Sequence, residues 1–434
     1  MKNIPIISYK DVLKNIENKE NHLLIGNGFN YGLGVCTGYR AIFQKMSENN
    51  KNLYKDALSM FEECNFDLEN FIGKLEKDIS DDNIFLKKYV KNKIKLDFMQ
   101  ATHEIVKANI KNIYAKKNEG IFLLLKNFTN YFTLNYDLFL YLLLLKYKPK
   151  DNNSKNNVIA FEPTLKFIGE NLDEEQNNIY SEIKDARKNG ELSINFGHES
   201  NPLRKDFKKL TKTDFTAVVK VYSDKKGNNW KNKDIKRVVK LIIEEENTNQ
   251  HLDNVDDGSR YKQVGLFDNQ PEFVYENKLT QNVFFIHGAF HIYKDGKKYK
   301  KITQQSDKAL YERLEDILNN ENQDIVCVFQ NENKTDVINN NEYLKNCLDK
   351  LGKISGNLVI IGSSLSSNDN HIFEQINKSN IETVYISTLL KEIDKMRETA
   401  NSIFPEKNIF LFDAETITYE KPETIENQDH DKTN

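Results

Sequence analysis

Short apolar runs and helical patterns alternate along most of the chain. A run at 22–25 leads into a glycine-rich segment, and a run at 129–134 leads into an apolar helix; between them, apolar residues recur at helical spacing from 84 to 114. Further strand candidates lie at 283–286, 325–329, 358–361, 383–386 and 409–412. Strands that alternate with helices predict an α/β fold: a Rossmann-like, mostly parallel sheet with helices on both faces.

Two local signals add detail to this pattern. A helix is expected to begin within the segment 65–72, with Asn65 or Asp67 as its N-cap. Asp295 followed by Gly296, between two short β-like runs, predicts a hairpin.

The middle of the chain interrupts the alternation. Residues 151–255 are rich in Lys, Asn, Asp and Glu and include a β-like run at 215–222. We therefore expect an inserted polar α/β subdomain, which is peripheral because its composition cannot supply a large core. The Rossmann-like domain would then consist of 1–150 and 256–415, followed by a disordered acidic tail at 416–434.

Charge and composition exclude several classes of protein. The 434 residues include 62 Lys and Arg against 65 Asp and Glu, so no overall basic field attracts nucleic acid or a membrane surface. The longest strongly apolar stretch, 138–145, is far shorter than the ~20 residues of a spanning helix, and the N-terminus has no signal-peptide core. We expect a soluble cytoplasmic protein without nucleic-acid or membrane partners.

The cysteines argue against a metal site. The four of them are scattered and form no C-x-x-C pair, so neither a zinc ribbon nor a disulfide framework is expected. They are Cys36, Cys64, Cys327 and Cys347.

Four segments at predicted strand ends are candidates for chemistry, because ligands of such sheets bind beyond the carboxyl ends of the strands. The first is formed by Gly26, Asn27, Gly28 and Phe29. Glycines there let backbone N–H groups approach a pyrophosphate, and the alternative is a tight strand-to-helix turn. In the second, Asn135 can hold a water or hydroxyl beside a carboxylate, Asp137, that accepts from an amide NH2; the alternative is that both are helix caps.

The other two segments follow strands of the C-terminal part. His287, with Gly288 behind it, is placed to act as a general base near neutral pH, and the alternative is a structural histidine. Gly362, Ser363 and Ser364 offer small hydroxyls that can bond a ribose or phosphate. The alternative there is a capped turn into a helix at 371–377, with Asp369 near the cap.

Together the four segments resemble motifs of the sirtuin superfamily. The loop at 26–28 is similar to its Gly-Ala-Gly nucleotide loop, with Asn27 in place of Ala, and 133–137 resembles its Thr-Gln-Asn-Ile-Asp signature. His287 with Gly288 resembles the catalytic His-Gly, and 362–365 resembles the Gly-Thr-Ser-Leu ribose loop. The motifs occur in the same order, and the resemblance spans roughly 20–145 and 255–415.

The chain is also similar to an uncharacterised bacterial branch of the sirtuin-like proteins, through 24–29, 256–258, 287–296, 341–344, 362–365 and 370–372. It departs from the deacylases in two ways. A Lys-rich hairpin without cysteine stands where they carry a zinc module of two C-x-x-C pairs, and their Gly-Ile-Pro-Asp-Phe-Arg segment is absent. Neither zinc nor an acyl-lysine peptide channel is therefore expected.

Sirtuin-like proteins without the zinc module resemble NAD glycohydrolases of bacterial antiphage defence. The resemblance implies cleavage of NAD to nicotinamide and ADP-ribose, with Asp137 on the nicotinamide carboxamide and Asn135 on the ribose or the attacking water. His287 would polarise a ribose hydroxyl or that water. The loop at 26–29 would hold the pyrophosphate, and the loop at 362–364 would lie near the ribose.

An enzyme of this kind needs an off state, because constant cleavage would deplete the NAD of its own cell. We expect it to be controlled by homo-oligomerisation or by a separate activating partner protein. Two alternatives stay open: a non-catalytic NAD- or nucleotide-binding sensor or scaffold, and a protein ADP-ribosyltransferase. Release of nicotinamide from NAD by the purified protein discriminates among them.

Overall fold

The computed structural model describes residues 4–147, 174–188, 212–227, 230–246, 252–262, 272–302, 310–329 and 334–419. The chain divides into two compact units: the first combines Met1–Pro163 with Leu252–Asn434, and the second is Thr164–His251. The two chain ends that border the second unit meet within the first, where the amide of Leu252 donates to the carbonyl of Tyr147 at 2.9 Å. Each unit is described by itself.

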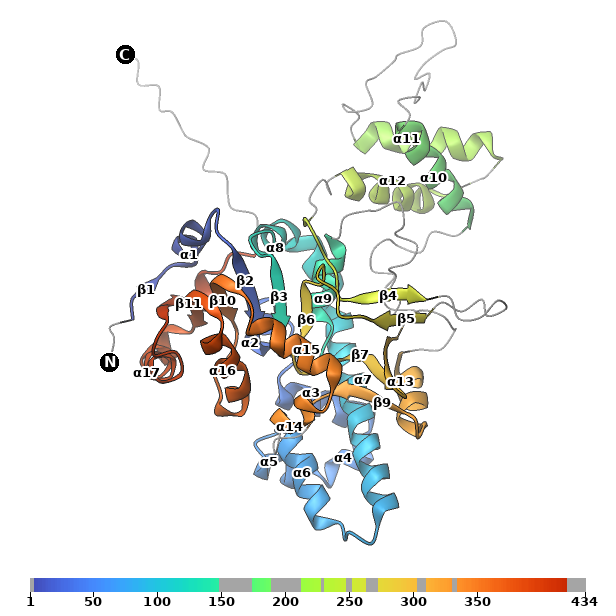
Figure 1. The fold of residues 1–434 in the computed structure, drawn as a ribbon. Helices are drawn as coiled ribbons and strands as arrows, with labels where there is room; N and C mark the ends of the chain where they lie inside the picture. Colours follow the sequence, from blue (N-terminus) through green and yellow to red (C-terminus); the bar gives the residue numbers. More distant parts are fainter. Residues whose placement is uncertain are drawn as a thin grey trace, which may run out of the picture. The chain divides into compact units, whose positions relative to one another are not determined.

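A seven-stranded parallel sheet forms the centre of the first unit, so the α/β, Rossmann-like fold is confirmed (Figure 1). Its strand order is β1-β12-β11-β10-β2-β3-β6, and helices flank it. The strands are β1 (Ile6–Ile7), β2 (Asn21–Ile25), β3 (Asn130–Thr133), β6 (Val283–Phe285), β10 (Ser355–Ile361), β11 (Asn380–Thr388) and β12 (Asn408–Asp413).

The central strands are buried on both faces, which explains why they appear in the sequence as continuous apolar runs. All five residues of β2 are buried, and so are the last five of β10, its neighbour. The polar residues at the start of β2 are satisfied: the side-chain amide of Asn21 donates to the carbonyls of Ile16 and Lys19 at 2.7 and 2.9 Å.

The helices of the first unit follow the predicted periodicity. The helix expected from 84 is α7, which extends to residue 116, and the helix expected to begin within 65–72 is α6. Asp67 is the N-cap of α6, since its carboxylate accepts from the amides of Glu69 and Asn70. The helices are α1 (Tyr9–Ile16), α2 (Asn27–Gly32), α3 (Tyr39–Asn49), α4 (Lys51–Lys55), α5 (Leu58–Glu63), α6 (Leu68–Asp78), α7 (Ile84–Lys116), α8 (Asn118–Leu125), α9 (Phe139–Lys146), α13 (Leu310–Asn319), α14 (Lys334–Asn339), α15 (Glu342–Leu351), α16 (Asn370–Lys378) and α17 (Ile393–Ile403).

A second, antiparallel sheet has the order β4-β5-β8-β7-β9. It contains the predicted hairpin, in which Asp295 pairs with Lys298 and Gly296 has a φ of +57°. It also contains the run at 325–329, which was expected among the parallel strands; that strand, β9, instead pairs antiparallel with β7. An apolar run predicts a buried strand, but it does not indicate which sheet the strand belongs to. The strands are β4 (Ser259–Lys262), β5 (Glu272–Tyr275), β7 (Gly288–Asp295), β8 (Lys298–Lys301) and β9 (Gln323–Cys327).

The described residues of the second unit form three helices, α10 (Glu174–Lys188), α11 (Lys212–Lys225) and α12 (Asn232–Glu246). The strand expected at 215–222 is wrong, because these residues lie in α11. Phe215, Val218 and Val219 recur at helical spacing and are all buried in a small apolar core shared with α10 and α12. Their β-branched side chains favoured a strand locally, but packing of this one face decided for a helix.

The end of the described chain packs on the first unit. Ile417 and Tyr419 are buried, and the ring of Tyr419 lies edge-on to that of Phe29 with 6.3 Å between centroids. The expected disordered tail from 416 therefore began too early, and residues 420–434 lie outside the described part. Among the residues described, no helix is both long enough and apolar enough to cross a membrane.

Candidate functional site

The four candidate loops meet at one edge of the parallel sheet. They follow β10, β2, β3 and β6, which are consecutive neighbours in the sheet (Figure 1). Because all four strands run in the same direction, their carboxyl ends and the loops beyond them lie side by side. This is the position at which α/β sheets of this type bind ligands.

Two of the loops touch through their glycines. The amide of Gly28 donates to the carbonyl of Gly362 at 2.9 Å, and the amide of Gly26 donates to Ile361 at 2.9 Å. A Cβ on Gly28 would lie 2.6 Å from Cα of Gly362, and a Cβ on Gly362 would lie 2.1 Å from the amide nitrogen of Phe29. The glycines are thus needed for this loop-to-loop contact, and both of these amides already have protein acceptors.

The other two residues of the first loop support it from inside. The side chain of Asn27 donates to the carbonyl of Thr37 at 3.0 Å and accepts from its hydroxyl at 2.6 Å. Phe29 is fully buried and packs against Phe139 of α9. These side chains fix the shape of the loop, and its exposed backbone is what remains for a ligand to contact.

Asn30 joins the first and second loops. Its side-chain amide donates to Asp137 Oδ2 at 2.8 Å and to the hydroxyl of Thr37 at 2.8 Å, and its oxygen accepts from Asn135 Nδ2 at 3.2 Å. Asn30 is fully buried, so this bridge lies beneath the site rather than in it. It brings Asn135 and Asp137 into one fixed arrangement.

Both carboxylate oxygens of Asp137 accept hydrogen bonds, and the N-cap of α9 is Leu138 rather than Asp137. Its Oδ1 accepts from the amide of Phe139 at 2.8 Å, as a capping carboxylate at the start of α9 would, while Oδ2 faces Asn30. Burial raises the pKa of Asp137 to about 6, and hydrogen bonds from Phe139, Asn30 and its own amide only partly oppose this rise. Each oxygen keeps a second lone pair, so the carboxylate can still accept from a ligand amide.

His287 faces this pair from the neighbouring strand end. Its Nδ1 lies 3.3 Å from the carbonyl of Leu134, immediately before Asn135, and its Nε2 lies 3.3 Å from Nε2 of His371. A carbonyl only accepts, so neutral His287 carries its proton on Nδ1 and presents a bare Nε2. Burial lowers the pKa of His287 to about 3 and that of His371 to about 4, which keeps both rings neutral near pH 7.

Charged residues from three further elements line the same side. Asp369 Oδ1 lies 3.6 Å from His287 Nε2 and 3.6 Å from Lys334 Nζ, yet it has no hydrogen-bond partner among the described residues. Lys334, at the start of α14, also pairs with Glu69 of α6 at 3.1 Å. The hydroxyl of Tyr136 lies 2.5 Å from Glu69 Oε1. Burial raises the pKa of Glu69, and the nearby ammonium of Lys334 only partly offsets this rise.

The two serines of the loop at 362–364 differ in exposure. Ser363 is buried and its hydroxyl accepts from the amide of Leu365 at 3.2 Å, whereas Ser364 is exposed. Leu365 has a φ of +52°, a strained conformation for a residue with a side chain. Of the two serines, Ser364 is the one free to turn toward a ligand.

Sequence reasoning did not find all of these residues. It assigned no role to Asn30, Glu69, Lys334 or His371. Asn30 and His371 occur in segments that were singled out, Asn30 two residues after Gly28 and His371 two residues after Asp369. Glu69 and Lys334 carry no local signal, since only the packing of α6 and α14 brings them to the site.

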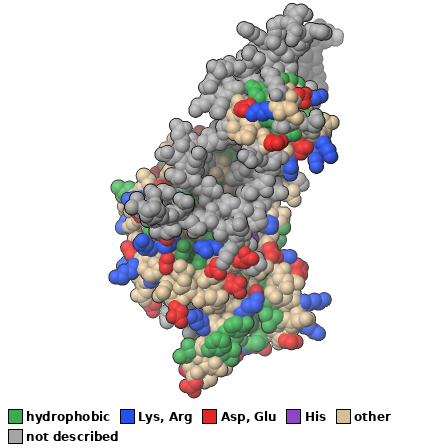
Figure 2. Space-filling model, turned by 90° about the vertical axis from the view of Figure 1, so that its right-hand side faces the viewer, with side chains coloured by type: hydrophobic (Ala, Val, Ile, Leu, Met, Phe, Trp, Pro, Cys, Tyr) green, Lys and Arg blue, Asp and Glu red, His purple; other side chains and the backbone are tan. Residues whose placement is uncertain are grey.

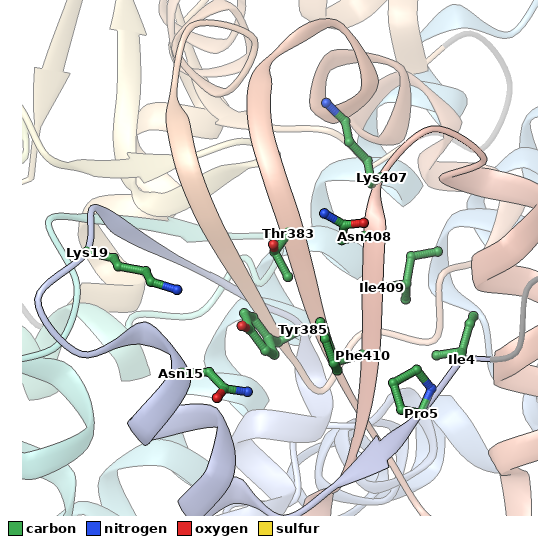
Figure 3. Close-up of a pocket in the computed structure, with 10 residues that line it drawn as sticks. All are labelled: Ile4, Pro5, Asn15, Lys19, Thr383, Tyr385, Lys407, Asn408, Ile409 and Phe410. Carbon is green, nitrogen blue, oxygen red and sulfur yellow. The ribbon is translucent and has the colours of Figure 1, made fainter.

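A separate hollow of about 580 Å³ lies on the amino-terminal half of β11 and β12 (Figure 3). Three of its polar side chains are already engaged: Lys407 Nζ donates to the carbonyl of Ser379 at 2.9 Å, and the side chain of Asn15 bonds to Tyr385. It contains neither a histidine nor a carboxylate. We therefore place the candidate site at the four loops and not in this hollow.

Within the described residues, no three His, Cys, Asp or Glu side chains are grouped to hold a metal ion. The four cysteines are free thiols, of which Cys64 and Cys347 are buried.

Comparison with known proteins adds one match to this geometry. No curated protein matches the chain. Residues 241–419 match a family described as a domain of unknown function (DUF4917). The match covers less than half of the chain; it includes His287, His371 and Asp369 and leaves out Asn135 and Asp137.

Proposed function

We propose that this protein is an NAD glycohydrolase, which uses water to cleave NAD to nicotinamide and ADP-ribose. One observation carries the proposal: Asn135, Asp137 and His287 come together at the carboxyl edge of neighbouring parallel strands, beside the loops at 26–29 and 362–364. The resemblance of these motifs to the sirtuin superfamily, in the same order, supports NAD as the substrate.

The chemistry suits the groups present. Breaking the bond between nicotinamide and ribose passes through an oxocarbenium-like state, so the enzyme must hold the nucleotide, place a water and keep other water out. Asp137 would accept from the carboxamide NH2 of nicotinamide, and Asn135 would hold the ribose or the attacking water. His287 is neutral near pH 7 with its proton on Nδ1, so its Nε2 can accept a hydrogen bond from a ribose hydroxyl or from the attacking water and polarise it.

The biological role follows from the cost of the reaction to the cell. A protein that destroys NAD suits a bacterial antiphage defence in which the infected cell stops growing, and it requires control by assembly or by a partner protein. We propose this role for the chain.

The test is to incubate the purified chain with NAD and measure nicotinamide, at low and high protein concentration. Asn135→Ala and His287→Ala should each lower turnover by ~10²–10⁴-fold if they place or polarise a reacting group. His103→Ala, on α7 and outside the four loops, serves as the matched histidine control. Calorimetry on the same variants separates lost chemistry from lost NAD binding.

Three results would contradict the proposal. NAD binding without nicotinamide release at either concentration would favour a non-catalytic sensor or scaffold. Release of nicotinamide with ADP-ribose attached to protein would favour an ADP-ribosyltransferase. Turnover like that of the unmodified protein in both alanine variants would remove these residues from the mechanism.

A further inference from the structure

The first turns of α7 expose an apolar surface. We call it the tip patch, and it consists of Ile84, Phe85, Leu86 and Tyr89, whose exposed fractions are 73%, 79%, 39% and 60%. The rings of Phe85 and Tyr89 are stacked, with 6.2 Å between their centroids. Hydrophobic side chains gather at this end of the molecule in Figure 2. Clustered exposed apolar side chains usually mark an interaction surface.

The packing of the first unit does not require these side chains. α7 is held to the body farther along, where Ile94 and Phe98 are buried. Phe85 and Tyr89 are four residues apart and so lie on one face, which the helical repeat turns away from the face of Ile94 and Phe98. Their apolar area is therefore available to a partner without any change in the core.

We propose that the tip patch is a self-association surface, which pairs with the tip patch of a second copy of this chain. Charges around the patch are arranged for an antiparallel pairing about a two-fold axis. Asp82 lies three residues before Phe85, and Lys88 lies three residues after it; both are exposed. Asp82 lies in the turn before α7 and Lys88 lies within α7, so an antiparallel pairing would bring the acidic turn of each copy toward the lysine of the other.

The tip patch is also connected to the candidate site. α6 begins beside the site, where Glu69 contacts Tyr136 and Lys334, and its far end leads through a short turn into the tip patch. Pairing of two tip patches would therefore affect the position of α6, which contributes Glu69 to the site. This consequence rests on the proposed function, whereas the pairing itself does not.

The experiment measures the mass of the full-length protein by sedimentation, from nanomolar to ~100 µM. We expect a monomer that becomes a dimer as the concentration rises. Phe85→Lys should keep the protein monomeric over the whole range. The matched control is Leu279→Lys, which adds the same charge at a leucine that is 98% exposed elsewhere, and it should dimerise normally.

Charge exchange tests the partner and the orientation. Asp82→Lys and Lys88→Asp should each weaken the dimer, and the double variant should recover it, because the pairing is self-complementary. At concentrations where the unmodified protein is monomeric, thermal unfolding should be the same in every variant, since all of these side chains are exposed. A monomer at every concentration, a dimer that Phe85→Lys leaves intact, or a double variant no stronger than its parents would overturn the proposal. Nicotinamide release is not part of this readout, so the two proposals fail independently.

Discussion

Two clusters of buried ionisable side chains in the first unit differ in how completely they are satisfied. In one, Asp257 Oδ2 accepts from Lys301 at 2.9 Å and from the hydroxyl of Tyr141 at 2.6 Å, while Oδ1 accepts from Ser259 at 2.7 Å. The side chain of Lys301 is 1% exposed and that of Asp257 is 6% exposed. Lys301 and these donors hold the pKa of Asp257 well below its usual range.

The cluster at the candidate site is looser. His287 and His371 meet at 3.3 Å, and Asp369 Oδ1 lies 3.6 Å from both His287 and Lys334. That carboxylate oxygen is buried and has no hydrogen-bond partner among the described residues. Burial without a bond costs free energy, so a structure that keeps such an atom invites an explanation.

The two clusters therefore differ in what they can offer to a ligand. The Asp257 cluster closes on itself and joins β4, β8 and α9, so it adds stability and offers nothing to a ligand. The His287–Asp369 cluster leaves acceptor capacity unused where four loops meet. A ligand with hydroxyl or amide donors would satisfy this oxygen. Five variants, in four predictions, test this comparison.

The largest effect on stability should come from Lys301→Met. The change leaves the Asp257 carboxylate buried without its cation, and breaking a buried pair from one side costs about 3–5 kcal/mol. Denaturant unfolding measures this loss. Lys298→Met, at an exposed position of the same strand, should stay within about 0.5 kcal/mol. A loss below about 1 kcal/mol for Lys301→Met would show that the closed cluster is not structural.

Asn30→Ala should come next. It removes the acceptor of Asn135 and a donor to Asp137, and each buried group left unsatisfied costs about 1–3 kcal/mol. We also expect nicotinamide release to fall, because Asn135 and Asp137 lose the bridge that aligns them. Activity that survives a clear loss of unfolding free energy would show that the bridge is only structural.

The two sides of the site should respond to acid with opposite signs. His287, with a pKa of about 3 in the folded protein against 6.5 ordinarily, is protonated first in the unfolded chain, so stability is lost as pH falls from 6.5 toward 4. Asp137, at about 6 against 3.8, is protonated first in the folded protein, so stability is gained as pH falls from 6 toward 4.

Each contribution should reach roughly 1–2 kcal/mol at pH 5. Unfolding free energies measured from pH 7 to pH 5 should therefore fall less steeply for His287→Gln than for the unmodified protein, and more steeply for Asp137→Asn. Equal slopes in the three proteins would mean that neither group is held in the protonation state that its burial implies.

The fold and the meeting of the four loops at one edge of the sheet were predictable because they depend on short-range patterns. Strands such as β2 and β10 are buried on both faces, so their apolar runs stand out in the sequence. Alternation with helices then sets them parallel, and parallel strands bring the loops beyond their carboxyl ends to one edge. Asn135 and His287 could be selected on this argument alone.

The rest depended on packing that no local pattern encodes. Glu69 and Lys334 are 265 positions apart in the sequence (334 − 69), and only the meeting of α6 and α14 makes them a pair. Gly28 and Gly362 are also needed for the close contact between their two loops, which the sequence did not indicate. The run at 215–222 shows the converse, because its β-branched residues had a local preference that helix packing overrode.

The smallest effect on stability, and the sharpest test of the comparison, should come from Asp369→Asn. The change keeps the shape of the side chain and removes a charge whose Oδ1 makes no hydrogen bond in the described structure, so the unfolding free energy should move by less than about 1 kcal/mol. If that oxygen accepts from a ribose hydroxyl, loss of the charge should weaken NAD binding by about five- to tenfold, and titration calorimetry measures this directly. Asp336→Asn, on the exposed side of α14, is the matched control and should change neither quantity. The opposite pattern, a large loss of stability with unchanged NAD binding, would make the His287–Asp369 cluster as structural as the one around Asp257.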